Sequence, residues 1–306
     1  MASKARIIVF GYHEVGYRCL EWLVSQGEQV VAVFTHEDRL REEIWFRSVA
    51  GLAHTHGIPV FTPPSLREGK IEAQIREWDP DVVYSFYYRN MIPRGILGIP
   101  RRGALNMHGS LLPRYRGRVP INWAIIQGET ETGATLHHMV VRADAGDIVD
   151  QEAVPIGSSD TAHAVFLKVT DAAVKVLARN HESIVAGTAP RRVQDEASAT
   201  TFGARRPEDG RIDWNRPASE VYNLVRALTH PYPGAFSEIR GRKFYVWWGK
   251  PIGAPVLGTP LPPGQIMSTR PLVVATHGGG FCIEKLEWAA KDAREQHEFV
   301  TGELVG

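Results

Sequence analysis

The first third of the chain alternates short apolar runs with longer segments of helical spacing. The run RIIVFGY at 6–12 is rich in β-branched residues, and apolar residues at 15–25 recur every three or four positions. These patterns are typical of a buried strand followed by an amphipathic helix. Strands that alternate with helices favour a parallel sheet covered on both faces. The segments that follow repeat this alternation. The pattern predicts strands at 30–35, 58–62, 81–86 and 103–108, and helices at 44–56 and 65–78.

The pattern changes after this region. Segments 136–141 and 148–156, joined through 143–147, are predicted to form a hairpin, and 160–186 contains a long amphipathic helix. From about residue 203 the chain has a helix at 218–229 behind Pro217, a residue suited to a helix start. Short strands with glycine-rich turns follow, at 235–239, 244–248, 265–268, 272–276 and 281–288.

This organisation predicts two domains. The polar stretch 194–201 marks the boundary between them. Residues 1–203 are predicted to form an α/β, Rossmann-like domain with a mostly parallel sheet. Residues 204–306 are predicted to form a smaller, C-terminal OB-like β-barrel domain.

Composition narrows the possible functions. The chain has 306 residues, 43% of them apolar, and carries 35 Lys and Arg against 34 Asp and Glu, for a net charge of +1. Such a chain can bury a large core but has no overall positive field for nucleic acid. The two cysteines, Cys19 and Cys282, lie far apart without a secretory signal, which indicates a reducing compartment. We therefore expect a soluble, cytoplasmic protein with no membrane or nucleic-acid partner, since no apolar segment approaches the ~18 residues of a membrane span.

The segment NMHGS offers the first candidate chemistry. Asn106 and His108 stand two apart at the end of a predicted strand, so their side chains project to the same side. An amide can stabilise an oxyanion and an imidazole can move a proton, as acyl transfer requires. Asp144, in the turn 142–147, could favour a charged His108 if that turn folds over the strand ends. A polar pair that caps the strand, and an ordinary turn aspartate, remain the alternatives.

Other polar residues give weaker signals. Arg114, Arg116 and Arg118 in LLPRYRGRVP could bind phosphate or carboxylate, or simply form a solvated basic loop. The glycine spacing G-x4-G in FGYHEVG does not match the dinucleotide fingerprint. The histidines lack the Cys, Asp or Glu companions of a zinc site, so no metal is expected.

The motifs together resemble a known family. The run NMHGSLLPRYRGRVPINWAIIQGETETGATLHHMVVRADAGDIV is similar to the catalytic segment of formyltransferases that use 10-formyltetrahydrofolate, and the similarity extends from VVAVFTH to IDWNRPASEVYNLVRALTHPYPGAF. The resemblance implies an enzyme with 10-formyltetrahydrofolate as co-substrate. FGYHEVG, FTHEDR and TFGARRPEDG most resemble the branch that formylates UDP-4-amino-4-deoxy-L-arabinose, a step of lipid A modification and polymyxin resistance.

The resemblance also assigns roles. It implies that Asn106 stabilises the transition state, that His108 donates a proton, and that Asp144 keeps this histidine charged. Arg205 would contact the nucleotide of the substrate, and Tyr115 with Arg116 would add an aromatic face and compact charge. The implied folate pocket consists of Asn90, Met91, Ile92, Arg118, Val140, Val141, Arg142, Ala143 and Asp144.

Two rival functions stay open at this point. Methionyl-tRNA formyltransferase belongs to the same family, but the resemblance would then imply a basic insertion after the second strand. The segment HEDRLREEIWFRS is acidic as often as basic, which disfavours a tRNA. A catalytically silent nucleotide-binding module is the other rival. The oligomeric state is open as well, a homo-oligomer included.

Overall fold

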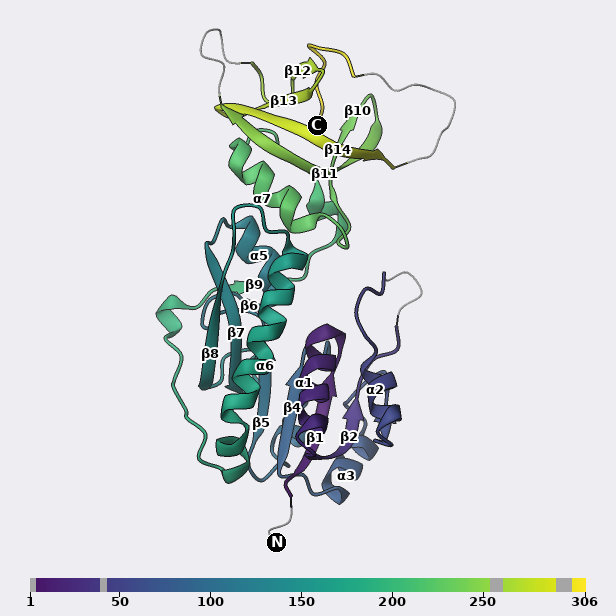
Figure 1. Ribbon diagram of the computed structural model, residues 1–306, viewed down its shortest axis with the longest axis vertical. Helices are drawn as coiled ribbons and strands as arrows, with labels where there is room; N and C mark the ends of the chain where they lie inside the picture. Colours follow the sequence, from purple (N-terminus) through teal and green to yellow (C-terminus); the bar gives the residue numbers. More distant parts are fainter. Residues whose placement is uncertain (1–3, 39–42, 254–260, 290–298) are drawn as a thin grey trace. The chain divides into compact units, whose positions relative to one another are not determined.

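The computed structural model describes residues 4–38, 43–253, 261–289 and 299–306. Its chain divides into two units, which are described separately (Figure 1). Two short segments from within residues 1–203 join the second unit, whereas the sequence predicts two uninterrupted domains. The first unit holds Met1–Pro120, Glu131–Pro155 and Phe166–Gly203, and the second holds Ile121–Thr130, Ile156–Val165 and Ala204–Gly306.

A seven-stranded sheet forms the first unit, in the order β3-β2-β1-β4-β5-β7-β8. The first five of these strands are parallel, β7 runs antiparallel to β5, and β8 runs antiparallel to β7. This confirms the mostly parallel sheet and the hairpin. The strands are β1 (Arg6–Gly11), β2 (Gln29–Phe34), β3 (Val60–Phe61), β4 (Val82–Phe86), β5 (Ala104–His108), β7 (Glu131–His138) and β8 (Ile148–Pro155).

Helices cover both faces of this sheet because successive strand residues point to opposite sides. Ile8 and Phe10 of β1 pack in one core cluster with residues of α3 (Gly69–Glu77) and α4 (Arg94–Leu97). On the other face, helices α1 (His13–Ser25) and α6 (Ala162–Ala186) lie side by side (Figure 1). The Tyr84 hydroxyl lies 3.0 Å from Nδ1 of His181, which connects β4 to α6. No helix within the described ranges has both the length and the apolar character needed to cross a bilayer.

Two helix starts differ from the sequence prediction. Helix α2 (Val49–Thr55) begins only after Ser48, whose Oγ accepts a hydrogen bond from the amide of Gly51 at 3.1 Å. The preceding aromatic residues pack on the ring of His13 instead, with ring centroids 4.5 Å away for Trp45 and 3.9 Å for Phe46. Helix α3 begins at Gly69. The hydroxyl of Ser65 accepts from the amide of Arg67 in a local turn, so it caps no helix.

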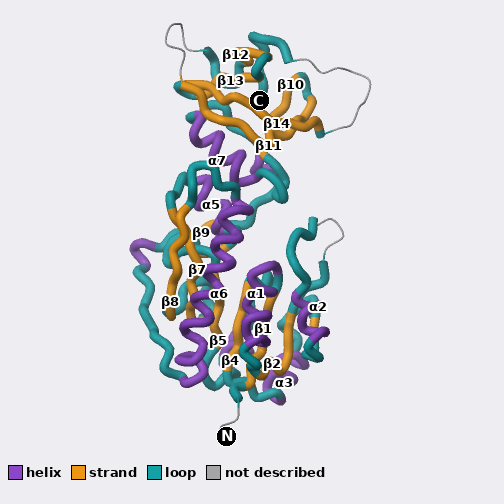
Figure 2. Tube along the Cα trace, in the orientation of Figure 1, coloured by secondary structure: helices purple, strands orange, loops and turns teal. Residues whose placement is uncertain are grey.

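The second unit contains a five-stranded antiparallel sheet in the order β10-β11-β14-β13-β12, which confirms an antiparallel β domain after the α/β domain (Figure 2). The C-terminal segment connects the two outer strands. The Gly306 amide donates to the carbonyl of Glu238, and the Ile266 amide donates to Glu303. The elements are α5 (Pro120–Ile126), η2 (Pro207–Gly210), α7 (Ala218–Leu228), β10 (Ala235–Ile239), β11 (Arg242–Gly253), β12 (Ile266–Thr269), β13 (Leu272–Thr276) and β14 (Gly279–Trp288).

A buried histidine at the end of β7 makes the stability of the fold depend on pH. Burial, and then the Arg191 guanidinium, lower the pKa of His138 below its ordinary value despite the opposing contacts of Pro190 and Asp147. An unfolded histidine has a pKa of about 6.5. Between that pH and the lower pKa of the folded protein, the unfolded chain binds a proton that the folded protein does not.

We therefore expect the free energy of unfolding to fall as the pH decreases below about 6.5, by at most ~1.4 kcal/mol per pH unit for this one group. Urea unfolding at pH 7.5 and 5.5 measures the loss. His138→Gln, which does not titrate, should lose less stability than the parent over this interval. Equal losses in the two proteins would contradict the assignment.

Candidate active site

Three side-chain nitrogens converge on one oxygen of Asp144. Asn106 and His108 share a face of β5, and His137 lies opposite Asn106 on the neighbouring strand β7. Nδ2 of Asn106, Nδ1 of His108 and Nε2 of His137 each lie 3.5 Å from Oδ1 of Asp144. The residues that the sequence predicted as an acyl-transfer group are therefore brought together around a single point.

The turn that carries Asp144 reaches this point by folding back over the sheet. Because β7 is antiparallel to β5, His138 pairs with Leu105 and the next amide, of Met139, bonds the carbonyl of Ala104 at 2.7 Å. The turn thus leaves the sheet four residues from His108, a distance of roughly 13 Å along a strand. Gly146 allows the return, since a Cβ there would lie 1.8 Å from the carbonyl oxygen of His138.

Asp144 is held as a carboxylate. Burial raises the pKa of this largely buried side chain, but His108, His137 and the amide of Gly117 outweigh that effect and leave the pKa well below its ordinary range. The Gly117 N–H donates to Oδ2 at 2.9 Å. The backbone φ of Asp144 is 53°, in the left-handed region that aspartate adopts more readily than most residues.

His108 is surrounded by acceptors. The side chain is buried, and its Nε2 lies 2.8 Å from the carbonyl oxygen of Tyr115. A carbonyl oxygen can only accept, so Nε2 carries a hydrogen, while Nδ1 faces the Asp144 carboxylate. Acceptors at both nitrogens are the partners that suit a doubly protonated imidazolium, the form that can give up a proton.

His137 is a residue of this site that the sequence analysis did not select. Its Nδ1 lies 2.9 Å from the carbonyl oxygen of His138, and its Nε2 lies 3.1 Å from Nδ2 of Asn106. It therefore orients the amide of Asn106. The sequence offers one signal for it, a histidine in the predicted hairpin strand. That signal is not enough, because only the register of β7 against β5 places His137 opposite Asn106.

Tyr115 and Arg116 do not lie where the prediction of a nucleotide contact requires. The Tyr115 ring is buried and stacks on Phe202, with centroids 5.1 Å apart and an interplanar angle of 13°. The Arg116 side chain is 2% exposed, and its guanidinium bonds Gln194 and Glu196. Both side chains are therefore committed to contacts within the protein rather than presented to a ligand.

The residues predicted for the folate pocket fall on three segments, at 90–92, at Arg118 and at 140–144, the last of which contains Asp144. Ile92 is buried in the core cluster against which Tyr88 and Met139 also pack, so the segments after β4 and β7 border the same core. Arg118 is exposed, and its Nη2 lies 3.3 Å from the carbonyl oxygen of Arg89. Asn90 is exposed, and its side chain opposes the rise in the pKa of Tyr88 that burial causes. The other predicted residues are mostly exposed, with side chains that are apolar at Met91, Val140, Val141 and Ala143 and charged at Arg142.

Arg205 belongs to the second unit. Its guanidinium carbon lies 4.7 Å from the ring centroid of Trp123 on α5, and Nη2 donates to the carbonyl of Asp209 at 2.6 Å. Burial lowers the pKa of Arg205, with Asp209 opposing the shift. Within the described residues its buried Nε has no hydrogen-bond partner. This cation is thus partly desolvated and has donor capacity left for an anion.

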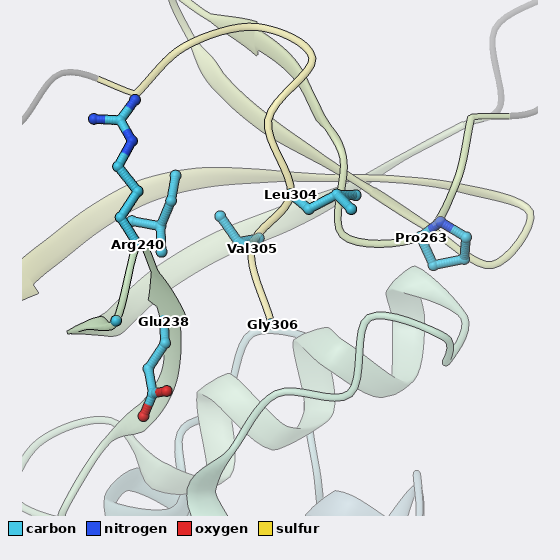
Figure 3. A pocket seen from close by; sticks show the side chains of 8 residues that line it. Glu238, Arg240, Pro263, Leu304, Val305 and Gly306 are labelled. Carbon is cyan, nitrogen blue, oxygen red and sulfur yellow. The ribbon is translucent and has the colours of Figure 1, made fainter.

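A cavity of about 350 Å³ lies in the second unit at the C-terminal segment (Figure 3). Its charged side chains are already paired, Glu238 with Arg211 at 2.9 Å and Arg240 Nε with Glu303 at 3.0 Å. None of the predicted site residues lines it. The described part of the chain also holds no group of three His, Cys, Asp or Glu side chains placed to bind a metal ion. The Asp144 cluster therefore remains the candidate active site.

Comparison with known proteins shows the family of this chain. Residues 5–180 match the formyl transferase family, and residues 205–304 match the C-terminal domain of formyl transferases. The chain therefore belongs to the formyl transferase family of enzymes, which confirms the family indicated by its motifs.

Solved structures share the fold. One is the N-formyltransferase of Helicobacter canadensis in complex with folinic acid and dTDP-3-aminofucose, with 19% identity over 93% of this chain and 100% of the other, and a TM-score of 0.73. The sugar 3N-formyl transferase WlaRD, with dTDP and 5-N-formyl-THF, has 17% identity over 95% and 100%, and a TM-score of 0.68. HypX from Aquifex aeolicus, with tetrahydrofolic acid, has 19% identity over 95% of this chain and 45% of the other, and a TM-score of 0.64.

Proposed function

We propose that this chain transfers the formyl group of 10-formyltetrahydrofolate to the amine of a nucleotide-linked amino sugar, with UDP-4-amino-4-deoxy-L-arabinose as the best candidate. The observation that carries the proposal is the convergence of Asn106, His108 and His137 on Oδ1 of Asp144. An amide donor, an imidazole and a fixed carboxylate in one buried group supply what formyl transfer to an amine requires.

Each residue has a distinct part in this proposal. The amine nitrogen attacks the formyl carbon, and the carbonyl oxygen becomes negatively charged in a tetrahedral intermediate. The Asn106 amide donates to that oxygen, and His108 gives its proton to the folate nitrogen as the bond to the formyl carbon breaks. Asp144 stabilises the charged His108, from 3.5 Å. A water held by Asp144 takes the proton that the attacking amine loses.

The segments 90–92 and 140–144 suit the folate substrate. Small-molecule pockets combine apolar lining with a few polar groups. Met91, Val140 and Val141 are 59%, 46% and 64% exposed and offer apolar surface to a ligand. The backbone of 90–92, the backbone of 140–144 and the Arg118 guanidinium supply the polar groups. Each of the three similar proteins named above was solved with a folate derivative.

A nucleotide sugar suits the charge of the chain better than a tRNA does. A tRNA needs many phosphate contacts over a broad basic face, whereas the net charge here is +1. Arg205, with its unpaired and buried Nε, is the residue we propose for the nucleotide phosphates. The two similar sugar formyltransferases were solved with dTDP ligands. The motifs FGYHEVG, FTHEDR and TFGARRPEDG favour the UDP-linked pentose.

An acceptor panel tests the proposal. Purified protein is assayed with 10-formyltetrahydrofolate and either UDP-4-amino-4-deoxy-L-arabinose, a dTDP-linked 3-amino sugar or methionyl-tRNA. UDP-L-arabinose, which lacks the amine, is the control. We expect the highest kcat/KM with the UDP-linked amino pentose and no product with the control. Turnover of the dTDP sugar alone would reject the pentose. Turnover of methionyl-tRNA alone would reject the sugar substrate. Nucleotide binding without any turnover would indicate a silent binding module.

A further inference from the structure

The turn of Asp144 has a backbone conformation that needs external support. A non-glycine residue at positive φ costs of the order of 1 kcal/mol, so this geometry persists only where neighbouring groups hold it. The Asp144 carboxylate must also stay within contact of Asn106 and His108, on a turn that folds back from the far end of β5. The residues that fix the backbone of this turn therefore decide where its carboxylate lies.

Gln194 holds that backbone. Its Nε2 donates to the carbonyl of Asp144 at 2.8 Å and to the carbonyl of Gly146 at 2.7 Å, so one amide brackets the turn. The Gln194 side chain is buried, with the residue 7% exposed. Two buried hydrogen bonds to successive parts of one turn leave it little freedom to move away from His108.

Arg116 fixes Gln194 in turn. Its Nε and Nη2 donate to Oε1 of Gln194 at 3.1 and 2.7 Å. Because the guanidinium only donates and the two turn carbonyls only accept, the amide of Gln194 can be oriented in one way. Glu196 accepts from both Arg116 and Arg142, at 2.7 and 2.9 Å. Because Arg142 begins the turn that carries Asp144, Glu196 also links the start of that turn to Arg116.

These contacts form a closed circuit through the candidate active site. Arg116 bonds Gln194, Gln194 bonds the backbone of Asp144, and the carboxylate of Asp144 accepts from the amide of Gly117, the residue after Arg116. Strand β6 (Arg116–Gly117) pairs with β9 (Thr201–Phe202), which follows η1 (Glu196–Ser198). The segment from Gln194 to Phe202 thus holds both ends of the circuit.

We propose that Gln194, oriented by Arg116, is a positioning residue that sets the carboxylate of Asp144 against His108 and Asn106. It touches no substrate and acts through Asp144 alone. This inference rests on the proposed formyl transfer. It also gives Arg116 a role in holding the active-site turn in place of the nucleotide contact that the sequence suggested.

Gln194→Glu separates the two halves of the circuit. A glutamate still accepts from Arg116, and more strongly because it is charged, but it cannot donate to the carbonyls of Asp144 and Gly146. We expect the protein to stay folded with a lower urea midpoint, because two buried carbonyls lose their donor. We expect kcat, measured well below that midpoint, to fall about 10 to 100-fold, since misplacing a reacting group by about 1 Å can cost 10²-fold. Val193→Ala is the matched control, because Val193 is the adjacent residue and is 79% exposed. It should behave as the parent does.

A double-mutant cycle with Asp144→Asn shows whether the effect passes through Asp144. Asparagine tolerates the left-handed backbone. If Gln194 acts only by placing this carboxylate, Gln194→Glu should change single-turnover rates less than about 3-fold in the Asp144→Asn protein, because residues in one network are not additive. Gln194→Met, which keeps the length of the side chain and loses both sets of bonds, should show the same non-additivity even if it is less stable.

Two results would overturn the inference. One is a kcat for Gln194→Glu within 3-fold of the parent. The other is a double variant whose loss of single-turnover rate equals the product of the losses of Gln194→Glu and Asp144→Asn. Failure of the proposed function gives a different pattern, in which Asp144→Asn itself has no effect or the parent transfers no formyl group. The single and double variants therefore distinguish the two failures.

Discussion

His108→Ala should lower kcat for formyl transfer by about 10² to 10⁴-fold, the range that a general acid contributes. His108 is the imidazole that both faces the Asp144 carboxylate through Nδ1 and is held by the Tyr115 carbonyl through Nε2. Alanine removes the proton that the departing folate nitrogen needs. Single-turnover formylation of the sugar nucleotide, at saturating concentrations of both substrates, measures the loss.

The protein should remain folded in this experiment. Loss of the imidazole removes one donor from the Tyr115 carbonyl, while the Asp144 carboxylate keeps the Gly117 amide. We expect a loss of stability of about 1–3 kcal/mol, which circular dichroism with urea unfolding measures. His54→Ala is the control, because His54 lies exposed on α2. We expect parental kcat for His54→Ala. A folded His108→Ala protein with turnover within a few-fold of the parent would refute the role of His108.

Asn106→Ala is expected to lower kcat by about 10² to 10³-fold, the usual effect of removing one oxyanion donor. Its Nδ2 is held by the contact with His137 at 3.1 Å and lies 3.5 Å from Oδ1 of Asp144. The N–H that is not directed at His137 can exchange its long contact with Asp144 for the carbonyl oxygen when that oxygen becomes charged. The effect should therefore appear in kcat more than in the KM for either substrate, in steady-state assays.

Asn215→Ala is the matched control for this substitution. Asn215 is exposed in the second unit and bonds Asp213, so its removal should leave kcat unchanged. If Asn106→Ala raised KM and left kcat at the parental value, Asn106 would be a binding group rather than a stabiliser of the transition state.

The parallel strands of the first unit and the pair at the end of β5 follow from local pattern, whereas β7 (Glu131–His138) begins five residues before the segment 136–141 that the pattern predicts. Period-two alternation places Asn106 and His108 on one face, and the carboxyl end of a parallel strand is where ligands of open sheets bind. Neither argument needs information from distant residues. The boundaries of β10 (Ala235–Ile239) and β13 (Leu272–Thr276) are likewise those that apolar runs between glycine-rich turns predict.

The rest of the site depends on contacts between residues far apart in sequence. His137 joins Asn106 only through the register of β7, and Asp144 reaches His108 only because its turn folds back across the sheet. Arg116 illustrates the same limit. A basic residue in a glycine-rich loop is equally suited to solvent, a phosphate or an internal partner, and its partner Gln194 lies 78 positions away.

The path of the chain between the two units bears on how members of this family could be recombined. Ile121–Thr130 and Ile156–Val165 are contributed to the second unit from within the α/β part of the sequence. They carry buried contacts there, such as Asn122 Nδ2 to the carbonyl of Ala227 at 2.8 Å and Arg226 Nη1 to the carbonyl of Asp160 at 3.1 Å. A chimaera joined once, after Gly203, would set these segments from one parent against a C-terminal region from another. Faithful exchange of the second unit therefore requires transplanting three pieces of sequence together.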